Sequence, residues 1–162
     1  MSIGVFYGST TGVTQEAAET IAEKLGAELH NVSDCDANAF DAYDVLVLGS
    51  STWGLGELQD DWADFLPKVE KGNLSGKKVA LFALGDQNSY SDTYGDAIAE
   101  IHDALSGAGV TFIGKWADSD YEGEGRAKVD GGWLGLMLDD NNQSDLTADR
   151  ISRWVEQLKS EM

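Results

Sequence analysis

The chain is poor in the two residues that most constrain a backbone. Among its 162 residues it has a single cysteine, Cys35, and a single proline. One cysteine cannot form an internal disulfide, and a metal site built from several cysteines is excluded. No Pro/Ser-rich stretch marks a linker. We therefore expect residues 1–162 to form one domain around one core, as is usual for this length.

Basic residues are also scarce. Eleven Lys and Arg stand against 29 Asp and Glu, so the formal net charge is −18. A surface of this sign repels the phosphates of nucleic acids and anionic lipids, and we expect neither as a partner. It would attract a protein with a basic face and speed their encounter. The same acidity could equally serve only to keep the chain soluble.

Long apolar runs are missing as well. No segment approaches the ~20 apolar residues of a membrane span. The first residues, Met-Ser-Ile-Gly-Val-Phe-Tyr, lack the basic flank and apolar run of an export signal. We expect a cytoplasmic protein, and a monomer by default.

Short apolar runs recur instead, and segments with helical periodicity separate them. The runs are rich in β-formers and mostly do not alternate, which is typical of strands buried on both faces of a parallel sheet. They lie at 3–7, 27–32, 43–48, 78–84 and 110–116, with helical segments at 13–25, 59–70, 93–106 and 146–159. This alternation predicts a doubly wound α/β fold. A loop-like stretch from 117, followed by an apolar strand over 132–138, predicts an insertion that splits the fifth strand.

The loop after the first run is suited to an anion. It consists of Ser9, Thr10, Thr11, Gly12, Val13 and Thr14. A strand-to-helix turn aims backbone N–H groups and the positive end of the helix dipole at one point. Four hydroxyls add donors, and the glycine lets the backbone approach closely. The lysine of a P-loop and the Gly-x-Gly-x-x-Gly of a dinucleotide site are both missing. We predict a monophosphate site; the alternative is a helix start capped by one of the hydroxyls.

Aromatic residues stand in the loops after the third and fourth runs. Trp53 lies among small residues in Ser51, Thr52, Trp53, Gly54, Leu55 and Gly56, and Tyr90 follows Leu84, Gly85 and Asp86. In a doubly wound fold these loops gather outside the carboxyl ends of the strands. Two aromatic rings placed there can enclose a planar heterocycle. The sequence therefore predicts a flat, phosphate-bearing ligand.

These three loops, in this order, resemble the FMN-binding loops of flavodoxins. The tail at 135–147, Gly-Leu-Met-Leu-Asp-Asp-Asn-Asn-Gln-Ser-Asp-Leu-Thr, resembles the long-chain class of that family. The resemblance covers essentially the whole chain and implies a five-stranded parallel sheet in the order 2-1-3-4-5. It implies one FMN, with the phosphate at residues 9–14 and the ring cradled by 51–56 and 84–86. Trp53 and Tyr90 would cover the two faces of the ring, and Thr93 and Asn141 would lie near the ring and the ribose. The chain departs from the family pattern at Ser51, often a proline, and at Val13, where a basic residue is common.

The resemblance implies an electron-transfer protein and not an enzyme, because the flavin carries the chemistry and the protein tunes it. Implied partners are redox proteins with basic docking faces, such as an NADPH-dependent reductase, and nitrogenase or radical-enzyme acceptors. The docking face would include the acids at 57, 60, 61 and 64, which could instead only stabilise a helix start. An FMN-dependent reductase on the same fold remains the alternative.

Other polar and aromatic residues are predicted to be structural. His30 and His102 have no metal-type spacing around them. Asp139 and Asp140 could bind a cation, but a solvated loop is the favoured interpretation. Tryptophans 116, 133 and 154 fall in strand or helix patterns and are expected in the core. Trp62 belongs either to the core or to a layer beneath the flavin loop.

Overall fold

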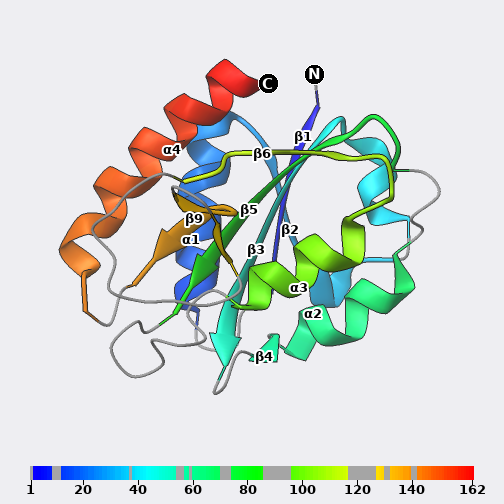
Figure 1. Ribbon diagram of the computed structural model, residues 1–162, viewed down its shortest axis with the longest axis horizontal. Helices are drawn as coiled ribbons and strands as arrows, with labels where there is room; N and C mark the ends of the chain where they lie inside the picture. Colours follow the sequence, from blue (N-terminus) through cyan, green and yellow to red (C-terminus); the bar gives the residue numbers. More distant parts are fainter. Residues whose placement is uncertain are drawn as a thin grey trace.

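Strands and helices alternate along the chain in the computed structural model (Figure 1), which describes residues 2–8, 12–36, 38–53, 57–58, 60–69, 74–85, 96–116, 127–129, 132–139 and 142–162. The strands of the main sheet are β1 (Ile3–Gly8), β2 (Glu28–Asn31), β3 (Val45–Trp53), β4 (Glu57–Leu58), β5 (Lys78–Leu84), β6 (Thr111–Ile113) and β9 (Leu136–Leu138). A separate hairpin contains β7 (Lys128–Val129) and β8 (Gly132–Trp133). The α-helices are α1 (Val13–Leu25), α2 (Asp60–Phe65), α3 (Asp96–Leu105) and α4 (Thr147–Glu161).

The sheet is parallel apart from β4, and its order is β2-β1-β3-β5-β6. On the outer side of β5, β6 pairs with residues 78–80 and β9 pairs with residues 82–84. These two short strands lie end to end along β5 and are the halves of one split fifth strand. The predicted order 2-1-3-4-5 and the splitting insertion are therefore confirmed.

Only part of the predicted strand at 132–138 joins this sheet. Gly132 and Trp133 pair antiparallel with β7, and only residues 136–138 pair with β5. The chain bends between them, where an added Cβ on Gly135 would lie 2.0 Å from the carbonyl oxygen of Leu81. A glycine is thus required where the insertion returns to the sheet.

Helices cover both faces of the sheet. α1 and α4 pack together on one face, and α2 and α3 lie on the other (Figure 1). The central strands are consequently buried on both sides, which explains their unbroken apolar runs. Tryptophans 116, 133 and 154 are all buried, as predicted. No helix within the described ranges is long and apolar enough to cross a membrane.

Two helix ends show what the local sequence imposes. α1 has its predicted bounds and ends at Gly26, whose φ of 66° is the left-handed conformation that glycine adopts readily. The predicted helix at 59–70 is wrong in length, because α2 ends at Phe65 and a 3-10 turn, Leu66–Lys68, follows. Pro67 lies in that turn and has no N–H to continue the α-helical ladder.

Candidate functional site

The carboxyl ends of four strands form one row across the sheet, at the lower edge of Figure 1. Gly8, the last residue of β1, is paired with Ser50 of β3. One residue further on, Ser51 is paired with Leu84 at the end of β5, and Leu84 is paired with Leu138 at the end of β9. Since neighbouring strands lie about 4.8 Å apart, the row spans roughly 15 Å. The loops predicted to bind a ligand therefore all leave the sheet along one short line.

The first of these loops leads into the start of α1, where the N-cap residue makes no side-chain capping bond. Gly12 is the N-cap residue, with a φ of 89°, and its carbonyl accepts the N–H of Glu16 at 3.1 Å. Glycine has no side chain with which to cap the helix, and the first-turn N–H groups have no acceptor within the helix. A Cβ on Gly12 would meet nothing within 4 Å. The conformation, and not crowding within the protein, thus requires glycine here.

The predicted phosphate residues are only partly described. Val13 and Thr14 begin α1, and Thr14 is almost fully buried. Ser9, Thr10 and Thr11 lie outside the described residues. The N-cap position is therefore Gly12, and the alternative prediction of a hydroxyl cap at that position is wrong.

The second loop is the end of a tight hairpin. β3 continues five residues beyond its predicted end at 48, because residues 49–51 still pair with β5. It then pairs antiparallel with β4, through Thr52 with Leu58 and Trp53 with Glu57. Three residues, Gly54, Leu55 and Gly56, connect the two strands, and they lie outside the described residues. The hairpin fixes the backbone at 52–53 at the edge of the candidate site.

The third loop leaves β5 beside the end of β9. The N–H of Gly85 donates to the carbonyl of Leu138 at 3.1 Å, which holds the two strand ends together. Leu84 is buried at this edge. The remaining predicted site residues of this region, Asp86, Tyr90, Thr93 and Asn141, lie outside the described part of the chain.

Trp62 supports the site from within the core. Its side chain is fully buried, and its indole Nε1 donates to the carbonyl of Gly49 on β3 at 2.6 Å. The ring also packs edge-on against Phe65, with centroids 5.9 Å apart. Of the two predicted places for Trp62, the core is the one observed, and the side chain ties α2 to the strand that leads into the hairpin.

Asp139 contradicts its prediction as a solvated loop residue. It is completely buried directly after β9, and its carboxylate accepts the backbone N–H and the side-chain amide of Asn142. Arg150 on α4 is also buried and donates from Nη1 to Oε1 of Gln143 at 2.8 Å. Arg150 was not predicted to be buried, although it lies four residues before Trp154 and eight before Leu158. Helical periodicity alone places it on the buried stripe.

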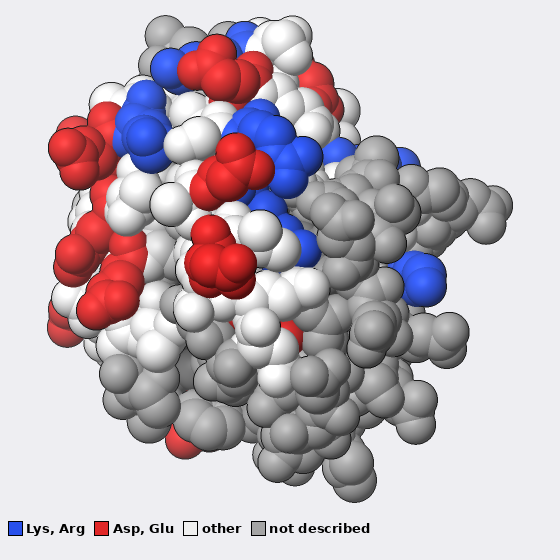
Figure 2. Space-filling model, turned by 90° about the vertical axis from the view of Figure 1, so that its left-hand side faces the viewer, with Lys and Arg blue, Asp and Glu red and all other residues white. Residues whose placement is uncertain are grey.

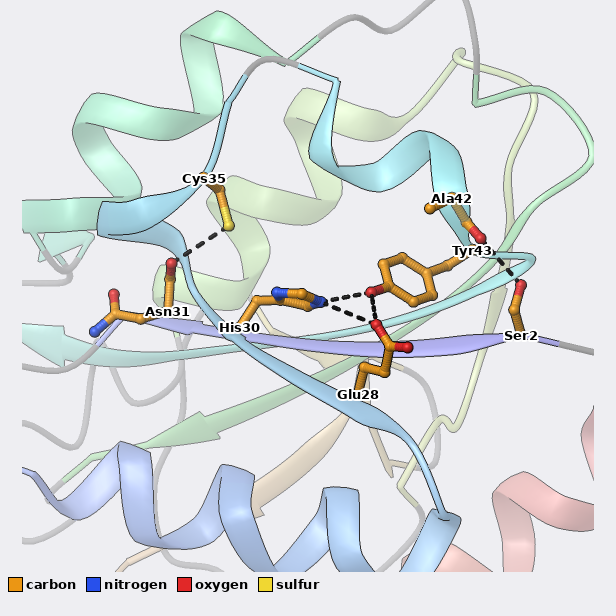
Figure 3. Close-up of polar contacts among 7 residues, drawn as sticks. All are labelled: Ser2, Glu28, His30, Asn31, Cys35, Ala42 and Tyr43. Carbon is orange, nitrogen blue, oxygen red and sulfur yellow. Dashed lines mark hydrogen bonds and ion pairs between the residues drawn. The ribbon is translucent and has the colours of Figure 1, made fainter.

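The two histidines have structural surroundings, as predicted. His30 is hydrogen-bonded to the hydroxyl of Tyr43, which donates in turn to Glu28 (Figure 3). Burial, followed by this bond to Glu28, raises the pKa of Tyr43 to about 12. His102 stacks on Phe112 with ring centroids 4.1 Å apart. Nowhere in the described ranges do three or more His, Cys, Asp or Glu lie in a group that could hold a metal ion.

Comparison with known proteins agrees with this geometry. The family model "Flavodoxin" matches residues 5–154. The flavodoxin of Trichodesmium erythraeum is 43% identical, covering 98% of this chain and 96% of its own. Flavodoxin 2 of Escherichia coli K12 is 44% identical over 100% of this chain and 97% of its own. The chain belongs to the flavodoxin family. A solved structure extends the likeness to three dimensions: the Fusobacterium nucleatum flavodoxin bound to flavin mononucleotide superposes with a TM-score of 0.92 at 28% identity, over 99% of this chain and 98% of the other.

Family membership indicates why the strand ends that form this row matter for ligand binding. In open α/β sheets a ligand binds outside the carboxyl ends of the strands, where the strand order reverses. Here that point lies between β1 and β3, which carry the two flavodoxin loops on either side of it. The strand ends that lead into both loops thus lie at the switch point, where this fold binds a ligand.

Proposed function

We propose that this flavodoxin binds one FMN at the carboxyl ends of β1, β3 and β5 and carries single electrons between redox proteins. The observation that carries the proposal is the row of paired strand ends, Gly8 with Ser50 and Ser51 with Leu84. It brings the three flavodoxin loops to one edge of the sheet. Residues 1–162 would act as one domain.

The start of α1 fits the phosphate of FMN. A phosphate needs several converging donors, and the first-turn N–H groups of a helix supply them together with the positive end of its dipole. The positive φ of Gly12 turns the chain into that helix without a side chain over its end. The hydroxyls of Ser9, Thr10, Thr11 and Thr14 would complete the site. No charge pair is needed, because the backbone dipoles at the start of the helix are fixed in place.

The hairpin of β3 and β4 and the loop after β5 would hold the ring. Backbone groups at 52–56 and 84–86 would bind its polar edge, while Trp53 and Tyr90 would cover its faces and exclude water. Thr93 and Asn141 would lie beside the ring and the ribose. When bound, the flavin supplies the one-electron chemistry. The contribution of the chain is to bind it, orient it and limit its contact with solvent.

The carrier function is better supported than the alternative of an FMN-dependent reductase. Flavodoxins are electron-transfer proteins, and the relatives named above are flavodoxins that match this chain over nearly its whole length. A reductase would need a second pocket for its substrate or for a pyridine nucleotide. The split fifth strand further supports placement in the long-chain class.

Flavodoxins act with redox partner proteins, and the charges of this chain suggest how partners would approach. Asp60 and Asp64 are exposed at α2, which begins at the site end of the sheet. Lys24, Lys78 and Lys159 lie at the opposite end, because α1 and α4 end there and β5 begins there. On the face that carries α4, the visible Lys and Arg lie in the upper and middle parts among Asp and Glu side chains (Figure 2).

This asymmetry would turn the acidic end, with the flavin edge, toward a basic partner. An NADPH-dependent reductase as donor, and nitrogenase or a radical enzyme as acceptor, are the partner classes we propose. The protein would act as a cytoplasmic monomer. Electron-transfer rates that fall with rising salt would support docking of this kind, and a flat salt profile would count against it.

Stepwise anaerobic reduction with dithionite, followed by visible spectroscopy, tests the proposal. The purified protein, reconstituted with FMN if it is colourless, should be yellow and should pass through a stable blue half-reduced state before it bleaches. Direct bleaching without the blue state would favour the reductase. A protein that fails to take up added FMN would refute the proposed function.

A further inference from the structure

We infer that Arg150 is a positioning residue for the proposed FMN site. Its buried guanidinium holds Gln143, and through it Asp139 and Asn142, in place between β9 and α4, beside that site. The inference rests on the proposed function, because it concerns the shape of the same site.

Arg150 is in an unusual position for a cation. It is the fourth residue of α4 and is 1% exposed. A positive charge near a helix N-terminus opposes the helix dipole, and its burial removes it from water. Arg153, one turn further on, shows the ordinary case: its side chain is 53% exposed and pairs with Asp149 on the same helix. Neither the stability of α4 nor its solubility therefore explains an arginine at position 150.

The contacts of Arg150 lead into the β9–α4 connection. Nη1 donates to Oε1 of Gln143 at 2.8 Å. The backbone N–H of Gln143 donates to the carbonyl of Asp139 at 2.8 Å, and the carboxylate of Asp139 accepts from both the backbone N–H and the side-chain amide of Asn142. A buried cation, a buried carboxylate and two amide side chains thus hold one turn of chain. Because charged groups are costly to leave unsatisfied, such a network fixes a single conformation.

This turn adjoins the candidate site. Asp139 directly follows Leu138, whose carbonyl accepts the N–H of Gly85 at the start of the third loop. Asn141, predicted to lie near the ring and the ribose, stands in the chain between Asp139 and Gln143. The residues on both sides of it are therefore fixed by the network that Arg150 completes. Without that network, the turn would have to be ordered when FMN binds. The free energy spent on ordering it would lower the FMN affinity.

Arg150→Met tests this inference, since methionine replaces the apolar stem of arginine but removes the guanidinium with its charge and its donors. The matched control is Arg153→Met, which removes an exposed cation from the same helix. Dissociation constants would be measured for the apo-protein with FMN and with riboflavin, by the quenching of flavin fluorescence. Urea denaturation of each apo-protein would show that it is folded under the binding conditions.

We expect Arg150→Met to raise both dissociation constants about tenfold, because the released turn would have to be ordered when the flavin binds. The ratio of FMN to riboflavin affinity should stay constant, because the turn follows β9, at the other end of the row of strand ends from β1 and its proposed phosphate loop. Arg153→Met should change neither constant. Arg150→Lys, which keeps a charged donor, should restore part of the affinity. Gln143→Met should match Arg150→Met, and the double variant should be no worse than either, as for two members of one network.

Other outcomes would overturn the inference. Unchanged constants for a folded Arg150→Met would show that Arg150 stabilises α4 and nothing more. A loss confined to FMN would mean that it acts on the phosphate and not on the turn. An equal loss in Arg153→Met would point to net charge alone. If the wild-type chain bound neither flavin, the proposed function itself would fail, and this inference with it.

Discussion

Replacing Gly49 by alanine should expose how tightly the centre of this sheet is packed. Gly49 lies on β3 beside Phe82 of β5. A Cβ on Gly49 would stand 2.0, 2.2 and 2.4 Å from three carbons of the Phe82 ring. Non-bonded carbons prefer about 3.5–4.0 Å, so the ring would have to move by roughly 1.5 Å. Phe82 is completely buried and packs edge-on against Trp154, so the ring has no free space to move into.

Overpacking of this kind costs typically 1–3 kcal/mol, and the severity of the clash places Gly49→Ala near about 3 kcal/mol. That is a large share of the roughly 5–15 kcal/mol by which a domain is stable. For a chain of this length it corresponds to a fall in Tm of roughly 6–12 °C. Urea denaturation of the apo-protein, followed by circular dichroism, measures the free energy directly.

Two further variants isolate the cause. Gly26→Ala introduces a Cβ that meets nothing within 4 Å, at a φ of 66°, so it should cost only the backbone strain of about 1–2 kcal/mol. Phe82→Leu removes the clashing ring, and the double variant with Gly49→Ala should be more stable than the sum of the single losses predicts. A Gly49→Ala protein destabilised by less than about 1 kcal/mol, or strict additivity in the double variant, would refute the packing argument.

Three further predictions follow from the described contacts. Because burial, and then the bond to Glu28, raises the pKa of Tyr43 to about 12, its contribution to stability should be complete below about pH 10 and should be lost progressively as the pH rises to 12. Urea denaturation from pH 9 to 12 should show that Tyr43→Phe lacks this loss. Burial, reinforced by Asp34 and Asp36, raises the pKa of Cys35, so iodoacetamide at pH 8 should alkylate the native protein more slowly than the urea-unfolded one; equal rates would contradict this. Gly12→Ala should strain the start of α1 by about 1–2 kcal/mol and weaken FMN more than riboflavin, and a proportional loss for both flavins would argue against phosphate binding there.

The sequence predicted best those elements that are determined by nearby residues or that have the same apolar environment at every position. The apolar run at 78–84 became β5 without change, because both of its faces are covered and every position favours an apolar residue. The shortened α2 could have been predicted from Pro67, whose effect on a helix is purely local. The extension of β3 through residues 49–51 could not, because it depends on pairing with residues 82–84, which are distant in the chain.

In the candidate site, too, residues with locally determined conformations were predicted, and residues buried by tertiary packing were not. Gly12 was singled out from its own loop, and its positive φ is a local property of the backbone. Asp139 and Arg150 were missed because charged residues near a charged stretch are normally solvated. Their burial results from the packing of α4 against β9 and α1, which no single segment encodes. Only the spacing of Arg150 from Trp154 and Leu158 carried a signal.

The charges of the chain explain why the site would hold an anion with so few cations. A protein with a net charge of −18 repels a phosphate, and a lysine in the first loop would be the simplest remedy. That loop has none, so donors that carry no net charge, the N–H groups at the start of α1 and the nearby hydroxyls, would have to suffice. Four of the described lysines, 24, 77, 78 and 159, lie at the other end of the sheet. Arg150 is a cation at the site end, and it is buried, where it can shape the binding turn without neutralising the acidic surface that a basic partner would meet.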